Sequence, residues 1–336
     1  MSTPGSPWVA LAATDDLPID PAPVATATAG IAEFATVALP YKPLSEDEAI
    51  YYAGQFAGAA GILLRSGYIT DGLLGHLPAL RIVAVHGAGV DPVDVGACTR
   101  RGIWVTNTPG ANANAVAELT LGLMLSLIRG IPHSAHGATV ERSWDEARTL
   151  GGELRGRTLG VLGIGRIGTE VGRLGRAFGM HVIAYDPLLE APAIVERGAE
   201  AVELAELFAR ADVLSLHAPG IDDTRHLIAE DSLRRMKPGA LLVNCARGSL
   251  IDERALAAAL GSGHLAGAAL DVLEGEPPDP ASPLYDAPNV IITPHMAGST
   301  TECLRAIAET AAHDIARVLT GEMPLHSVNE PVLAGQ

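Results

Sequence analysis

Two series of short, almost uninterrupted apolar runs constrain the fold of this chain most strongly. The first series, between Trp8 and Val105, contains WVALAA, FATVAL, GILLR, RIVAVHG and IWVTN. The second series begins at TLGVLGIG and continues through HVIAYD, DVLSLHAP, GALLVNCA, LAGAALDV and NVIITP. Strands that are apolar at every residue are typical of parallel sheets covered by helices on both faces. The pattern therefore predicts an α/β fold with two open, doubly wound parallel sheets.

Two helical segments stand outside this alternation. The segment ANANAVAELTLGLMLSLIRG, residues 111–130, has an acidic residue near its start and a basic residue near its end, as the helix dipole favours. It is predicted to be one long, mostly buried helix. The last helical pattern, from Thr300 to Leu319, follows the completed second series. We expect this helix to pack back on the first domain.

Composition excludes several classes of protein. The chain has 336 residues, 48% of them hydrophobic, which is enough for two domains with large cores. Its 39 acidic and 23 basic residues give a net charge of -16, which argues against non-specific binding to nucleic acid or to an anionic membrane. The most apolar later stretch, Leu119 to Ile128, is too short to cross a bilayer. The start of the chain has no basic residue ahead of its first apolar run, so no export signal is indicated.

The number and spacing of the cysteines indicate the redox environment of the protein. Cys98, Cys245 and Cys303 are far apart and form no CxxC pair. Neither a disulfide framework nor a zinc site is indicated, and we expect no metal. A cytoplasmic protein is predicted.

A glycine motif opens the second series. Gly163, Gly165 and Gly168 form GxGxxG between the strand TLGVLG and a helical pattern. The first glycine permits a tight turn, the second lets a pyrophosphate approach the backbone, and the third lets helix and strand pack closely. Arg166 and Ile167 would supply backbone amides to the phosphates. The alternative is a plain glycine turn.

An acidic residue strengthens this interpretation. Asp186 ends the next strand, eighteen residues after Gly168, about where a carboxylate meets the adenosine ribose of a dinucleotide. Its charge would repel a 2'-phosphate. NAD is therefore the predicted cofactor in preference to NADP.

Three polar residues follow later strands of the same series. Arg247 lies in VNCARGSLIDE, Glu276 in ALDVLEGEPP and His295 in VIITPHMAGST. Open α/β sheets bind ligands at the carboxyl ends of their strands. A guanidinium can hold a carboxylate with two hydrogen bonds, and a carboxylate beside an imidazole raises the imidazole pKa. The three residues are predicted to be catalytic, although each alone could be structural or solvent-exposed.

With these motifs, the chain resembles the D-isomer-specific 2-hydroxyacid dehydrogenases, and within them most closely the phosphoglycerate dehydrogenase branch. The resemblance covers nearly the whole chain and lies in VHGAGVDPVDVGACTRRGIWVTNTPG, LGVLGIGRIG, VNCARGSLIDE, AALDVLEGEPP and TPHMAGST. It implies a Rossmann-type NAD-binding domain, residues 109–298, inserted into a flavodoxin-like substrate domain made of residues 1–108 and 299–336. The site would lie in the cleft between the two domains.

The resemblance also implies individual roles. Arg247 would orient the substrate, His295 would move a proton and Glu276 would be its partner, while Arg65 would reach toward a distal anion. Asp271 would face the nicotinamide amide. Further cofactor contacts are implied for His217, Ala218, Pro219, Thr224, Cys245, Ala246 and Gly298, and substrate contacts for the backbone of Gly87, Ala88 and Gly89.

These expectations lead to one main function and two alternatives. The main prediction is an NAD-dependent oxidoreductase that interconverts a small D-2-hydroxy acid and its 2-oxo acid, for example 3-phosphoglycerate, hydroxypyruvate or glyoxylate. The alternatives are an NAD(H)-sensing, corepressor-like binding protein, and the same chemistry on a phosphonate. A homodimer is expected through the helix from Asn114 to Ile128, for which the other interpretation is an internal core helix.

Overall fold

The computed structural model describes residues 7–42 and 44–331 of the chain. The chain folds into two compact units. The first unit comprises Met1–Asn112 and Ser299–Gln336, and the second comprises Ala113–Gly298. The second unit is therefore inserted into the first, and each is described separately below.

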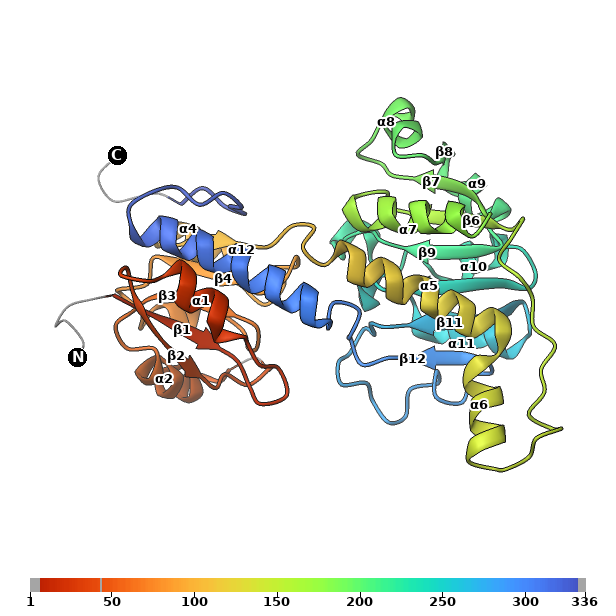
Figure 1. Cartoon of the computed structure of the whole chain (residues 1–336), viewed down its shortest axis with the longest axis horizontal. Helices are drawn as coiled ribbons and strands as arrows, with labels where there is room; N and C mark the ends of the chain where they lie inside the picture. Colours follow the sequence, from red (N-terminus) through yellow and green to blue (C-terminus); the bar gives the residue numbers. More distant parts are fainter. Residues whose placement is uncertain (1–6, 43, 332–336) are drawn as a thin grey trace. The chain divides into compact units, whose positions relative to one another are not determined.

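The first unit contains a five-stranded parallel sheet (Figure 1). Its strand order is β2-β1-β3-β4-β5, the flavodoxin-like order. The order reverses between β1 and β3, so the carboxyl ends of these strands mark the point where such sheets bind ligands. The strands are β1 (Trp8–Ala12), β2 (Glu33–Val37), β3 (Ala59–Leu64), β4 (Ile82–Val85) and β5 (Trp104–Thr106).

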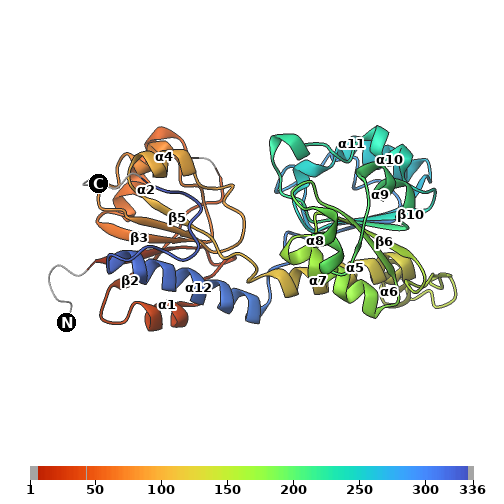
Figure 2. The same cartoon turned by 90° about the horizontal axis from the view of Figure 1, so that it is seen from above.

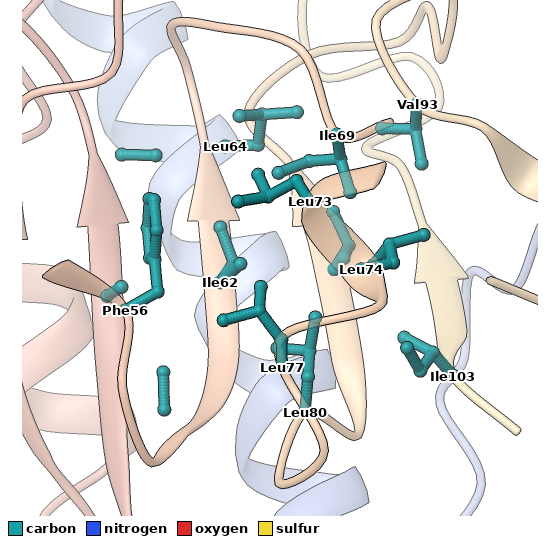
Figure 3. Packing of buried hydrophobic residues seen from close by; sticks show 14 of the residues in the cluster. Phe56, Ile62, Leu64, Ile69, Leu73, Leu74, Leu77, Leu80, Val93 and Ile103 are labelled. Carbon is teal, nitrogen blue, oxygen red and sulfur yellow. The ribbon is translucent and has the colours of Figure 1, made fainter. Parts of the chain in front are cut away.

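Helices cover both faces of this sheet (Figure 2). One face packs against α1 (Pro21–Ala27) and α12 (Thr301–Leu319), which is the helix expected to return to this domain. The other face packs against α2 (Glu46–Gln55), α3 (Asp71–Leu74) and α4 (Val95–Arg100). Figure 3 shows the core on this second face, where Phe56 and Leu73 are fully buried beside Ile62 of β3.

The second unit contains a seven-stranded parallel sheet in the order β12-β11-β10-β9-β6-β7-β8. Counted from β6, this is the Rossmann order with one additional strand, so the predicted fold class is confirmed. The pair Glu200–Ala201, β8, was not predicted because two residues carry no recognisable alternation. The other strands are β6 (Thr158–Leu162), β7 (His181–Tyr185), β9 (Val213–Leu216), β10 (Ala240–Asn244), β11 (Leu265–Leu270) and β12 (Val290–Ile292).

The two faces of the second sheet are covered by different helices (Figure 2). On one face lie α5 (Ala113–Arg129) and α7 (Arg166–Ala177). On the other lie α9 (Leu204–Arg210), α10 (Glu230–Arg235) and α11 (Glu253–Gly261). The remaining elements are α6 (Ile131–Thr139), α8 (Ala191–Glu196) and the short 3-10 helices η1 (Asp222–Thr224) and η2 (Gly248–Leu250).

The long helix predicted over residues 111–130 is α5, and it is followed by a second helix that was not predicted. Gly130 has a left-handed backbone, with φ of 59°, and separates α5 from a second helix, α6. Helix α5 is largely buried within its own unit, whereas α6 and the following loop expose Ile131, Val140 and Trp144. Among the described residues, no single helix is long and apolar enough to cross a membrane, although α5 and α6, bent by 67°, meet the length and composition criteria as a pair.

Candidate active site

The glycine turn after β6 leaves no room for side chains at two of its positions. Gly163 has φ of +86°, and a Cβ there would lie 2.9 Å from the backbone of His217 and Ala218. A Cβ at Gly168, in the first turn of α7, would overlap the carbonyl oxygen of Gly163. Gly165 caps the same helix and has open space around it. The first amides of a helix have no acceptor within the helix, so this turn presents donors to an anion.

Asp186 follows β7 and is tied to the glycine turn. Its carboxylate accepts hydrogen bonds from the amide of Ile164 at 3.1 Å and from the amide of Leu188 at 3.0 Å. The Arg197 guanidinium donates to the carbonyl of the same Ile164 at 2.5 Å. Asp186 therefore supports the turn as well as standing at the expected ribose position.

The segment after β9 adjoins Gly163. Oγ of Ser215 lies 2.8 Å from Nε2 of His217, and burial lowers the pKa of His217 to about 3, so its ring is neutral at pH 7. Nδ1 of His217 is buried without a partner among the described residues. Thr224 donates to the carbonyl of Pro219 at 2.6 Å and closes this loop.

His295 and Glu276 form the central pair of the site. Nδ1 of His295 lies 2.7 Å from Oε2 of Glu276. The hydrogen bond to Glu276 raises the pKa of His295, while burial and the charge of Arg247 oppose the rise. Burial would raise the pKa of Glu276, but the hydrogen bond and charge of His295 lower it below the usual range. The pair therefore favours an imidazolium beside a carboxylate.

Hydrogen bonds to Asp271 fix the backbone around His295. The buried Asp271 follows β11, and its carboxylate accepts from Thr293 Oγ1 at 2.6 Å, from the amide of Met296 at 2.9 Å and from the amide of Ala297 at 2.8 Å. The amide of His295 donates to the carbonyl of Asp271 at 2.8 Å. His295 itself has φ of 49°, a left-handed conformation that a non-glycine residue adopts only when its surroundings enforce it.

Arg247 follows β10 and belongs to the same group. Its positive charge lowers the pKa of both His295 and Glu276, so the three side chains form one electrostatic group. A Cβ at Gly248 would overlap the backbone of Leu273, and a Cβ at Gly220 would lie 3.0 Å from the Arg247 side chain. Two glycines thus let the loops of β9, β10 and β11 converge on Arg247.

The other predicted cofactor residues lie along the same edge of the sheet. Cys245 is buried behind it, and burial raises the pKa of its thiol to about 12. Ala246 and Gly298 are partly exposed. The amide of Ala246 donates to the side chain of Asn244, whose Nδ2 donates to the carbonyl of Arg247.

In the first unit, Arg65 and His86 meet at the ends of β3 and β4. Nη1 of Arg65 lies 3.2 Å from Nδ1 of His86. The predicted substrate amides follow directly, and Gly87, Ala88 and Gly89 are all partly exposed. The amide of Gly87, however, already donates to the carbonyl of Val85 at 2.9 Å.

Sequence reasoning missed two contributors to this arrangement. Asn244 was not singled out, although a buried asparagine ending an apolar strand signals a local hydrogen-bonding role. His86 was also missed, although it directly precedes the glycine turn that was noted. For Asp271 the structure adds a function, because its carboxylate supports the His295 loop.

Comparisons with known proteins agree with this geometry. Residues 121–297 match the model of the D-isomer specific 2-hydroxyacid dehydrogenase, NAD binding domain. The chain belongs to the D-isomer-specific 2-hydroxyacid dehydrogenase family. The second unit is thus the NAD-binding domain of this family, and the glycine turn, the α7 amides and Asp186 fit a dinucleotide.

Individual members of the family show how far the likeness extends. A D-3-phosphoglycerate dehydrogenase of Methanocaldococcus jannaschii is 44% identical over 80% of this chain, which spans about half, 52%, of that relative's length. A glyoxylate reductase of Aeropyrum pernix is 42% identical over 78% of this chain and 80% of its own. The structure of a glyoxylate reductase from Paecilomyes thermophila has a TM-score of 0.84 and 31% identity, over 96% of this chain and 98% of that one.

The contact between His295 and Glu276 predicts how the pKa of His295 changes when the carboxylate is removed. In Glu276→Gln the carboxylate that raises the pKa of His295 is lost, while burial and Arg247 still lower it. The pKa of His295 should therefore fall in the variant, as measured by NMR titration of the imidazole. An unaltered titration of His295 would break the proposed coupling.

Proposed function

We propose that this protein is an NAD-dependent oxidoreductase that interconverts a small D-2-hydroxy acid and its 2-oxo acid. The observation that carries the proposal is the 2.7 Å contact between His295 and Glu276 beside Arg247. These groups follow strands of the sheet whose glycine turn fits a dinucleotide. A site with an imidazolium, a guanidinium and a bound dinucleotide suits carbonyl reduction next to a carboxylate.

Each catalytic residue has a separate task. When bound, the nicotinamide ring supplies or accepts the hydride. His295 gives a proton to the carbonyl oxygen during reduction and takes it from the hydroxyl during oxidation. Glu276 keeps the ring of His295 oriented and protonated at higher pH, and Arg247 holds the substrate carboxylate with its guanidinium.

The cofactor is bound mainly by backbone and one carboxylate. The turn Gly163 to Gly168, with the amides of Arg166 and Ile167, receives the pyrophosphate, and Asp186 accepts hydrogen bonds from the ribose hydroxyls. The loop residues that complete the cofactor site are His217, Ala218, Pro219, Thr224, Cys245, Ala246, Asp271 and Gly298. For Asp271 this role is indirect, through the His295 loop that it holds.

The first unit supplies the substrate contacts. The backbone of Ala88 and Gly89, with that of Gly87, receives the carboxylate, and Arg65 lies beside the more distal carbons. Relatives named D-3-phosphoglycerate dehydrogenase and glyoxylate reductase indicate 3-phosphoglycerate and glyoxylate as substrates to examine first. We add hydroxypyruvate, which the sequence also led us to expect. We assign the protein to the cytoplasm, which its three buried free thiols support.

We also propose a homodimer, but through a different surface from the one expected. Helix α5 is mostly covered within its own unit, whereas α6 and the loop after it expose Trp144 by 72% and Val140 by 65%. A hollow of about 670 Å³ lies between α6 and this loop and is lined by Ile131 and Trp144. A second copy of the chain would cover this apolar surface.

The catalytic role of His295 predicts a large kinetic effect. His295→Ala should lower kcat for the NADH-dependent reduction of glyoxylate and hydroxypyruvate by about a hundredfold or more, because a positioned acid is lost. The matched control is His133→Ala, an exposed histidine on α6, which should leave kcat unchanged. NADH binding by the wild-type chain without turnover of any 2-oxo acid would instead indicate a dinucleotide-sensing protein.

Cofactor choice depends on the charge of Asp186. The wild-type chain should use NAD with higher kcat/KM than NADP, and Asp186→Asn should narrow this ratio by about tenfold or more. Asparagine keeps one acceptor oxygen, which can still receive the Ile164 amide of the glycine turn, while the bond from the Leu188 amide and the negative charge are removed. Equal efficiency of the two cofactors in the wild type would remove Asp186 from this role.

The assembly can be tested at the exposed loop. Light scattering at micromolar concentration should give twice the chain mass of 34.7 kDa for the wild type and the single-chain mass for Trp144→Glu. Leu188→Glu, at an even more exposed apolar residue after β7, is the control and should remain a dimer. A wild-type mass near 34.7 kDa would contradict the proposed dimer.

A further inference from the structure

The contact between Arg65 and His86 determines how the histidine is protonated. A guanidinium has only N–H donors, so Nη1 of Arg65 donates and Nδ1 of His86 accepts across their 3.2 Å contact. A neutral imidazole that accepts at Nδ1 carries its proton at Nε2. His86 therefore offers an N–H donor on the side of its ring away from Arg65.

Two donors of this pair lack acceptors. Nε2 of His86 and Nε of Arg65 are both buried, and neither has a hydrogen-bond partner within the described parts of the chain. His86 as a whole is only 8% exposed. Buried donors are almost always satisfied in proteins, so a pair left open at the ends of two neighbouring strands points to an acceptor group that comes from a ligand.

The surroundings limit the charge of this ligand. Burial first, and then the charge of Arg65, lower the pKa of His86 to about 4, while backbone contacts, including one from Leu304, offset the shift only in part. Cys303, near the start of α12, lies close to Arg65, and burial raises the pKa of its thiol. At neutral pH His86 is thus neutral, and the pair carries the single positive charge of Arg65.

We propose that His86 and Arg65 form a subsite for the substituent on carbon 3 of the substrate, in which Nε2–H of His86 donates to an oxygen of that substituent. The inference rests on the proposed function and adds a specificity-determining residue to it. Both residues belong to the first unit, at the carboxyl ends of β3 and β4 next to the Gly87 turn.

This subsite selects by hydrogen bonding more than by charge. A hydroxyl or carboxylate group on carbon 3 has acceptor oxygens and at most one negative charge, which the two donors and the single positive charge of Arg65 match. A phosphate with two charges lacks a second cation here, because the neighbouring Val85 is apolar and His86 is neutral. Hydroxypyruvate should therefore be preferred to glyoxylate, and 3-phosphoglycerate should be used measurably but not preferentially.

Three variants of His86 distinguish the role of Nδ1 from that of Nε2. His86→Leu removes both nitrogens. His86→Asn keeps an acceptor near the Nδ1 position, which can hold Arg65, whereas His86→Gln keeps an amide donor near the Nε2 position. His76→Gln, at an exposed histidine of the same unit, is the matched control.

The expected result is a loss that depends on the substrate. With NADH and the full chain, kcat/KM for hydroxypyruvate should fall about tenfold in His86→Leu and His86→Asn, mainly through KM, with a several-fold smaller loss on glyoxylate. His86→Gln should recover part of the activity on hydroxypyruvate, and His76→Gln should match the wild type. In parallel, hydroxypyruvate but not glyoxylate should shift the Nε2 resonance of His86, identified by its absence in His86→Leu.

Several outcomes would overturn the inference without affecting the proposed function. Equal losses on both substrates, or full recovery by His86→Asn, would mean that His86 only holds Arg65 in place. Undiminished use of hydroxypyruvate by His86→Leu would mean that the ring does not contact the substrate. If the wild type reduced no 2-oxo acid, the proposed function would fail. The subsite would then be tested by the Nε2 resonance of His86 alone, and the absence of a shift with hydroxypyruvate would overturn it.

Discussion

The candidate active site depends on one buried carboxylate, that of Asp271. Its two oxygens accept three hydrogen bonds from the segment between Thr293 and Ala297, and its carbonyl accepts a fourth from His295. An uncompensated buried charge is costly, so this set of donors is what makes the position of Asp271 stable. The same bonds hold His295 in a left-handed conformation and aim its ring at Glu276. Catalytic geometry and local stability thus come from the same contacts.

Backbone crowding is the second constraint, because loops from four strands approach one another at the edge of this sheet. Gly163 contacts the segment after β9, and Gly248 contacts the segment after β11 at a distance that no Cβ would allow. Gly220 leaves space for the Arg247 side chain in the same way.

Sequence patterns predicted the sheets well because buried parallel strands are recognisable from their residues alone. They also predicted the residues that meet at the edge, since GxGxxG, Arg247, Glu276 and His295 all follow strands. They predicted the end of the long helix at Gly130, but they did not predict α6, which begins directly after that left-handed residue. Nor did they predict the partners of His86 and Asp271. Such contacts join residues from different strands or loops, and one sequence contains no record of them.

The charge of the chain explains why binding must be local. With a net charge of -16, the long-range field of the protein opposes an anionic substrate and an anionic dinucleotide alike. Attraction has to come from short-range donors in places with little water, where hydrogen bonds and single charges act most strongly. The α7 amides, Arg247 and the pair of Arg65 with neutral His86 are such donors. In the proposed subsite, His86 adds a hydrogen bond but no charge, so substrate tails would be discriminated by their acceptor geometry rather than by total charge.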